Sequence, residues 1–168
     1  MADGKRLFLA GLAFLLGLAA IAGAWAFQIF GGYAPCKLCL EQRIPYYVGL
    51  PLLFVAILFL IADRHLALAR TLALLAALAF LIGAGLGVYH AGVEWHWWIG
   101  PADCGGGVAT TGDAGDLLAQ IGKTKVVSCT DAALRVAGLS FAGWNALVSA
   151  LVALLAFAAA LGRPTREV

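Results

Sequence analysis

Four long stretches of apolar residues dominate the chain, and shorter polar segments separate them. Their interiors carry almost no charge, and they cover residues 7–30, 44–62, 71–90 and 141–161. Each approaches the roughly 20 residues that an α-helix needs to cross a hydrocarbon core of about 30 Å. Transmembrane strands would be shorter and would alternate apolar with polar positions. The pattern therefore predicts an all-α membrane protein, a bundle of four transmembrane helices.

The overall composition agrees with a membrane location. Of the 168 residues, 63% are hydrophobic and only 12% are charged, whereas a soluble domain has roughly 45–50% apolar and about 25% charged residues. The length suits one membrane domain over residues 1–168 embedded in the lipid bilayer, and nothing requires more than a monomer. No basic cluster indicates a nucleic-acid partner.

The first apolar stretch could also be read as a secretory signal peptide. Lys5 and Arg6 precede it, and residues 24–26 read Ala-Trp-Ala near its end. The apolar region of a signal peptide is typically only about 7–15 residues long, however, and this stretch is much longer. A retained first helix is therefore favoured.

The distribution of basic residues predicts the orientation in the membrane. Six Lys and Arg residues fall in the 21 residues of one set of segments, namely 1–6, 63–70 and 162–168. Only five fall in the 63 residues of the other set, 31–43 and 91–140. Because basic residues are enriched in cytoplasmic segments, both termini are expected in the cytoplasm. The loops 31–43 and 91–140 then lie outside the membrane on the opposite side.

All four cysteines lie in these two outer loops. Cys36 and Cys39 belong to the first, and Cys104 and Cys129 belong to the second. This distribution suits an oxidising compartment, where disulfides persist. Four cysteines allow three pairings, of which Cys36–Cys39 with Cys104–Cys129 is the simplest.

Two structural interpretations of the cysteines compete with a redox role. Zinc sites favour two close cysteine pairs, but 24 residues separate Cys104 from Cys129 and no histidine lies near that pair, so we expect no metal. Inert disulfides could instead staple the loops of a non-enzymatic membrane scaffold. A Cys-x-x-Cys ring is so small that it gains little from loop closure, and such rings are typically redox-active.

The sequence around the first pair favours a reactive thiolate. The segment 35–45 reads Pro-Cys-Lys-Leu-Cys-Leu-Glu-Gln-Arg-Ile-Pro and leads into the second apolar stretch. If a helix starts near Leu38, then Cys39 and Arg43 share a helix face. A helix N-terminus and a guanidinium both stabilise a thiolate, which is the nucleophile of disulfide exchange. Arg43 could alternatively extend to lipid headgroups.

The motif Cys-x-Leu-Cys-x-x-x-Arg, from Cys36 to Arg43, resembles that of the bacterial disulfide bond formation protein B family (DsbB). The four expected helices and the second cysteine pair in the later outer loop also resemble this family. Tyr89-His90 and the segment from Gly138 to Asn145 add further similarity. The resemblance covers nearly the whole chain.

The resemblance implies a membrane thiol oxidase of the bacterial inner membrane whose cysteines face the periplasm. A thioredoxin-like dithiol protein of the DsbA type would attack the Cys104–Cys129 disulfide, forming a mixed disulfide with Cys104. Cys129 would then exchange with Cys36, leaving Cys39 as a thiolate beside a quinone, either ubiquinone or menaquinone. Arg43 and His90 are the candidate quinone-binding residues, because developing charge on the ring oxygens needs donors or positive charge.

Two other electron-transfer classes fit the sequence less well. Proteins similar to vitamin K epoxide reductase also join thiols to quinones, but their quinone-proximal Cys-x-x-Cys lies late in the chain. A haem carrier would need histidines on facing helices. Here His65 is on the cytoplasmic side, whereas His90 and His96 lie near the outer end of one helix.

Overall fold

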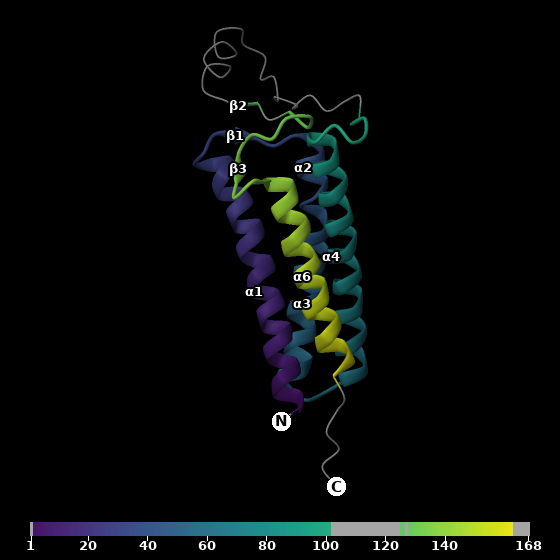
Figure 1. Cartoon of the computed structure of the whole chain (residues 1–168). Coiled ribbons are helices and arrows are strands. Elements are labelled where there is room, and N and C mark those ends of the chain that lie inside the picture. Colours follow the sequence, from purple (N-terminus) through teal and green to yellow (C-terminus); the bar gives the residue numbers. More distant parts are fainter. Residues whose placement is uncertain (1, 102–124, 127, 163–168) are drawn as a thin grey trace.

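Four long helices form an antiparallel bundle in the computed structural model, which describes residues 2–101, 125–126 and 128–162 (Figure 1). The long helices are α1 (Ala2–Ile29), α3 (Ile44–Ile61), α4 (Leu66–Glu94) and α6 (Phe141–Leu161). Within the described residues, four helical stretches are long and apolar enough to cross a membrane. Helices satisfy their own backbone hydrogen bonds, which hydrocarbon cannot do. The predicted all-α fold with four transmembrane helices is confirmed.

The bounds of α4 are wider than the expected stretch 71–90. The helix begins at Leu66, and Arg70 in its first turns donates from Nη2 to the carbonyl of Gly162 at 2.8 Å. The basic side chain is thus accommodated at the end of α6. At its other end α4 continues through four buried residues to Glu94, so a segment expected to start the second outer loop is helical.

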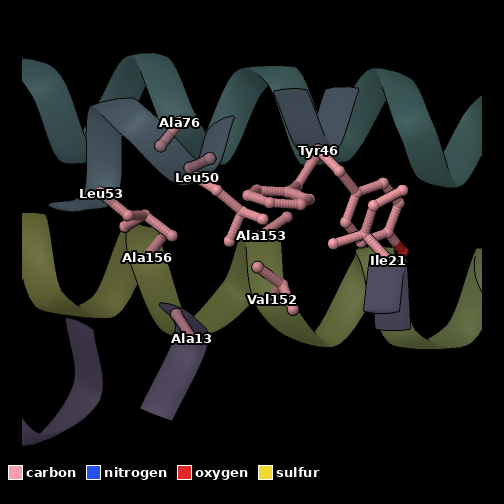
Figure 2. Packing of buried hydrophobic residues seen from close by; sticks show 11 residues of the cluster. Ala13, Ile21, Tyr46, Leu50, Leu53, Ala76, Val152, Ala153 and Ala156 are labelled. Atoms are coloured by element: carbon pink, nitrogen blue, oxygen red, sulfur yellow. The ribbon is translucent and has the colours of Figure 1, made fainter. Parts of the chain in front are cut away.

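Small residues let the helices pack closely in the centre of the bundle. Figure 2 shows side chains from all four helices meeting there, with Ala13 of α1, Ala76 of α4 and Ala156 of α6 fully buried. The larger side chains Tyr46 and Phe80 meet edge to face, with ring centroids 5.2 Å apart. Large apolar side chains are exposed along the outside of the bundle, as expected for a surface that contacts lipid.

Two glycines of α4 mark its closest contacts. A Cβ added at Gly87 would lie 2.8 Å from the backbone nitrogen of Ala146 in α6, and one added at Gly83 would lie 3.0 Å from Pro45 in α3. This agrees with the general use of small residues where membrane helices approach each other. The contact at Gly87 holds the first turns of α6, including Asn145, against α4.

Short elements cover one end of the bundle, opposite the start of α1 and the end of α6 (Figure 1). They are β1 (Tyr33–Ala34), the five-residue helix α2 (Lys37–Glu41), β2 (Lys125–Val126), β3 (Arg135–Val136) and β4 (Leu139–Ser140). Strands β1 and β2 pair in parallel, with Tyr33 opposite Lys125. The two outer loops are therefore joined by backbone hydrogen bonds.

A tight hairpin connects this layer to α6. Ala137 and Gly138, between β3 and β4, have φ values of 52° and 83°, the pattern of a type I′ turn. Ser140 then caps α6, because its Oγ accepts a hydrogen bond from the backbone nitrogen of Gly143 at 3.2 Å. The hairpin and the cap together fix where α6 begins.

Candidate functional site

The Cys36–Cys39 pair opens the short helix α2. Cys36 is the N-cap residue, and its Sγ accepts a hydrogen bond from the backbone nitrogen of Cys39 at 3.3 Å. Both are free thiols, and the two Sγ atoms lie 2.7 Å apart. A small movement would therefore bring the two sulfurs to bonding distance.

The helix N-terminus lies close to the position expected from the sequence. A helix was expected to begin near Leu38 with Cys39 near its N-terminus, and α2 begins at Lys37, with Cys36 as its cap and Cys39 in its first turn. The reason is local: the Cys36 sulfur itself supplies the capping acceptor. The partial positive charge of the helix end therefore acts first on Cys36.

The two cysteines face different surroundings. Cys36 is fully buried in a small cluster with Leu38, Val93 and Cys129, while Cys39 is partly buried and packs against that cluster. Cys39, but not Cys36, also lines the cavity described below. One sulfur of the pair thus faces the second outer loop, and the other faces the bundle interior.

Cys129 is fully buried beside the first pair. It is disulfide-bonded and therefore does not titrate. Its expected partner, Cys104, lies outside the described residues, so the predicted Cys104–Cys129 pairing stays a prediction. Of the two cysteines in the second outer loop, the structure thus brings Cys129 to the candidate site.

Hydrogen bonding favours the thiolate form of Cys36. The Cys39 thiol donates to the Cys36 sulfur and is the main reason why the pKa of Cys36 falls from 9.0 to about 5. Burial opposes this shift, whereas the contact with His90 adds to it. Because the thiolate is the reactive form, Cys36 is prepared for disulfide exchange at neutral pH.

His90, in the last turns of α4, lies beside the cysteine pair. Its side chain is buried, with Nε2 3.9 Å from Cys36 Sγ and Nδ1 2.6 Å from Gln42 Nε2. Glu94, one turn further along α4, places Oε1 3.9 Å from the same Nε2. Sulfur and nitrogen ligand atoms of Cys36, Cys39 and His90 also lie within 4.8 Å of one another.

Sequence reasoning missed Glu94, because it assigned the residues after His90 to a loop. The spacing of four residues from His90 would have indicated a shared face if the helix had been continued. Glu94 is 8% exposed, and its Oε2 has no hydrogen-bond partner among the described residues. A carboxyl group this buried at the edge of a cavity is a candidate for contact with a bound molecule.

Arg43 is buried at the same level but points toward α1. Its Nη1 donates to Gln28 Oε1 at 2.6 Å, its Nη2 donates to the carbonyl of Ala24 at 3.3 Å, and the guanidinium lies 5.0 Å from the ring centre of Trp25. These contacts hold a fixed positive charge beside the cavity, which Cys39 also lines.

A cavity of about 320 Å³ lies between the helices below the cysteine pair. Much of its wall is apolar and comes from α1 and α6, with Ala20, Phe27 and Val148 among the contributors. Its polar lining comprises Gln28, Cys39, Gln42, Arg43, His90, Glu94 and Asn145. The site therefore combines a reactive sulfur, an apolar slot and several hydrogen-bonding groups.

Four apolar spans and a thiol pair above this cavity define a multi-pass membrane protein of the thiol oxidoreductase class. A model of the family described as Disulfide bond formation protein DsbB matches residues 5–159. The chain therefore belongs to the DsbB family, as its motif suggested, and acts as an oxidoreductase in disulfide bond formation. No curated protein and no solved structure matches the chain.

Proposed function

We propose that this protein is a protein-dithiol:quinone oxidoreductase, which oxidises a periplasmic thioredoxin-like dithiol protein of the DsbA type and passes two electrons to a membrane quinone. The observation that supports it best is the two-sided placement of the first cysteine pair. Cys36 packs against Cys129 of the second outer loop, while Cys39 lines the cavity among the helices. Electrons arriving at one sulfur can leave from the other.

The distribution of charge supports the orientation that this function requires. Lys and Arg residues are about threefold denser in the segments at the ends of the chain and between the second and third spans, which favours a cytoplasmic location for these segments. The beginning of α1 and the end of α6 lie at one end of the bundle, and α2 lies at the other (Figure 1). The cysteine pair belongs to that end, because Cys36 caps α2 and Cys39 lies within it. The cysteines then face the periplasm of a bacterial inner membrane.

The volume and the lining of the cavity suit the head group of a quinone. Its volume of about 320 Å³ lies at the small end of the usual range for ligand sites, and an isoprenoid tail can extend into lipid. Apolar walls suit the ring faces, Arg43 offers donors for a ring oxygen, and His90 lines the same cavity. When bound, a quinone supplies an acceptor for two electrons and two protons.

The exchange steps balance without any further reactant. A thiolate of the partner attacks the Cys104–Cys129 disulfide and forms a mixed disulfide. The partner's second thiol then attacks this mixed disulfide, so that the partner leaves with an internal disulfide and Cys104 and Cys129 remain as a dithiol. Exchange of this dithiol with a Cys36–Cys39 disulfide re-forms Cys104–Cys129 and reduces the first pair. The first pair returns to the disulfide when two electrons and two protons pass to the quinone.

Three residues support the last step from different sides. Cys39 provides the sulfur that lines the cavity, Arg43 holds a fixed positive charge there, and His90 contacts the Cys36 sulfur. Preorganised charge of this kind acts where negative charge develops. Because Arg43 is already hydrogen-bonded to α1, it can serve this role without rearranging.

The experiment is quinone reduction by the purified protein, with and without a reduced thioredoxin-like dithiol partner. We expect reduction that depends on the partner and is lost in both Cys36→Ser and Cys104→Ser. Ubiquinone and menaquinone analogues are compared to identify the acceptor. If no quinone is reduced under any condition, a quinone is not the electron acceptor of this oxidoreductase and the proposal is wrong.

A further inference from the structure

A continuous chain of hydrogen bonds crosses the bundle and ends at His90. Tyr46 donates from its hydroxyl to Asn145 Oδ1 at 2.7 Å, and Asn145 donates from Nδ2 to Gln42 Oε1 at 2.7 Å. Gln42 Nε2 then lies 2.6 Å from His90 Nδ1. The chain joins α3, α6 and the turn after α2 to α4, next to the reactive cysteines.

The direction of this chain decides which nitrogen of His90 carries a proton. Each side-chain amide could be turned over, which would exchange donors and acceptors along the whole chain. The contact between Gln42 and the backbone of α2 removes this ambiguity. Gln42 Nε2 lies 3.2 Å from the carbonyl oxygen of Leu38, and a carbonyl oxygen can only accept.

Turning the Gln42 amide over would place its oxygen against the Leu38 oxygen with no hydrogen between them. In this buried setting, two facing acceptors lose a hydrogen bond and repel each other. The NH₂ group of Gln42 therefore faces both Leu38 and His90, and its oxygen faces Asn145. Since the amide donates to Nδ1, this nitrogen accepts, and the neutral imidazole carries its proton on Nε2.

We propose that Gln42 is a positioning residue that keeps His90 in the Nε2–H form, so that the imidazole presents an N–H group to the sulfur of Cys36. The proposal deepens the proposed oxidoreductase function, on which its catalytic meaning rests. In functional histidines generally, the hydrogen bond made by one ring nitrogen decides whether the other nitrogen carries the proton. Gln42 thus acts on Cys36 through His90, without contacting the reacting sulfur.

Other charged and titratable groups around Cys36 fit this assignment. Cys39 lies on α2, Glu94 lies on α4 one turn from His90, and Arg135 of β3 acts electrostatically on Glu94. The Nε2–H group is the one donor of a neutral His90, and it lies between Cys36 and Glu94. A metal ion bound at Nε2 would require the ring to carry its proton on Nδ1. The hydrogen-bond chain therefore disfavours a metal site formed by His90 and the two cysteines.

Nitrogen NMR of the full-length protein in detergent micelles tests the proposal directly. Histidine is labelled with ¹⁵N, and His65→Gln with His96→Gln leaves His90 as the only signal. The pH is kept where imidazole is neutral. We expect Nε2 to give the signal of a protonated nitrogen and Nδ1 that of an unprotonated one.

The matched variant Gln42→Glu inverts the expected signal at Nδ1. At a pH where the introduced carboxyl group is ionised it can only accept, so Nδ1 must then carry a proton whether the ring is neutral or charged. Tyr46→Phe serves as the comparison, because Leu38 and not Tyr46 sets the direction of the chain. In this variant the Nε2–H form is expected to persist.

Three results would overturn the proposal. They are a protonated Nδ1 in the otherwise unchanged protein, an unprotonated Nδ1 in Gln42→Glu with its carboxyl group ionised, and a reversed form in Tyr46→Phe. The first result requires no substitution at any residue of the hydrogen-bond chain, so it remains decisive even if the Gln42 and Tyr46 variants fold poorly. None of these measurements requires quinone or a dithiol partner, and failure here is therefore distinct from failure of the proposed function.

Discussion

Arg43 donates to Gln28 Oε1 at 2.6 Å and thereby ties the start of α3 to α1 beside the cavity. The guanidinium also lies over the ring of Trp25. A charge held on two sides in this way keeps a defined position before any ligand arrives. Such preorganisation is what makes fixed charges effective in binding sites.

Arg43→Ala is predicted to raise the apparent KM for quinone about tenfold to a hundredfold. A hydrogen bond to a charged group contributes about 1.5–3 kcal/mol, and each 1.4 kcal/mol corresponds to a factor of about ten. Steady-state quinone reduction at saturating dithiol partner measures this change. An unchanged quinone dependence would remove Arg43 from the binding site.

Gln28→Ala is the matched control for this prediction, because it removes the partner and leaves the charge. Arg43 would still be held by the carbonyl of Ala24 and by Trp25. We therefore expect a smaller rise in KM than for Arg43→Ala. Equal effects in the two variants would mean that Arg43 acts by fixing α1 and not by its charge.

The different surroundings of the two cysteines predict which mixed disulfide can be trapped. In Cys39→Ser, Cys36 keeps its contact with Cys129 but loses the thiol that would resolve an exchange. The Cys36 thiolate can attack Cys129 of the predicted Cys104–Cys129 disulfide and release Cys104 as a thiol, so a Cys36–Cys129 link should accumulate without any dithiol partner. Peptide mass spectrometry under non-reducing conditions detects it.

The reciprocal variant gives the control for this trapping experiment. In Cys36→Ser, the remaining Cys39 lines the cavity and lies outside the buried cluster's centre. We expect little Cys39–Cys129 link to form. Equal amounts of the Cys36–Cys129 and Cys39–Cys129 links in the two variants would show that Cys36 and Cys39 exchange with Cys129 equally well.

The lowered pKa of Cys36 predicts an unusual pH profile for its alkylation in the reduced protein. Only the thiolate reacts, so the rate should rise through a midpoint near pH 5 and stay level above it, whereas an ordinary thiol becomes reactive only near pH 8.5. Because trypsin cleaves after Lys37, Cys36 and Cys39 fall in different peptides and can be followed separately. The pH midpoint of the alkylation rate is the quantity to compare with that of an ordinary thiol, because burial of Cys36 slows the absolute rate.

Variants of the neighbours should raise this midpoint in a fixed order. Cys39 provides the largest lowering effect on the pKa of Cys36, and His90 provides a smaller one. Cys39→Ala is therefore expected to move the midpoint to higher pH by more than His90→Gln does. The reverse order would contradict the hydrogen-bond arrangement around Cys36.

Much of this arrangement could be predicted from residue types alone. Apolar stretches of helical length predict the four spans because hydrocarbon leaves the backbone few alternatives. The Cys-x-x-Cys pair and Arg43 could be singled out because their spacing is local. Gly83 and Gly87, two small residues four positions apart in one span, are likewise a local signal of close helix packing, and the structure has them against Pro45 and Ala146.

Contacts between distant parts of the chain could not be predicted in the same way. No local pattern singled out Gln42, because its role depends on Asn145, which lies 103 positions further along. The direction of Arg43 depends on Gln28 of α1. Glu94 was missed because the end of α4 is set by burial of its last turn, which hydrophobicity along the sequence does not show.

The contact at Gly87 predicts how the polar chain depends on helix packing. In Gly87→Ala, the new methyl group would lie 2.8 Å from the nitrogen and 2.9 Å from the Cα of Ala146. Backbone atoms cannot turn aside as a side chain can, so α4 and α6 must separate. Overpacking of this kind costs about 1–3 kcal/mol, and we expect thermal unfolding in detergent at a temperature several degrees lower.

Gly85→Ala is the control for Gly87→Ala, because no atom lies within 4 Å of the added methyl group there. It changes the same helix by the same substitution and should leave the unfolding temperature unchanged or slightly higher, since alanine favours the helix over glycine. Separation of α4 from α6 would also move Asn145 away from Gln42. Gly87→Ala should therefore weaken the preference of His90 for the Nε2–H form, while Gly85→Ala should preserve it. Equal stability and equal histidine signals in both variants would show that the approach of α4 to α6 does not position this chain.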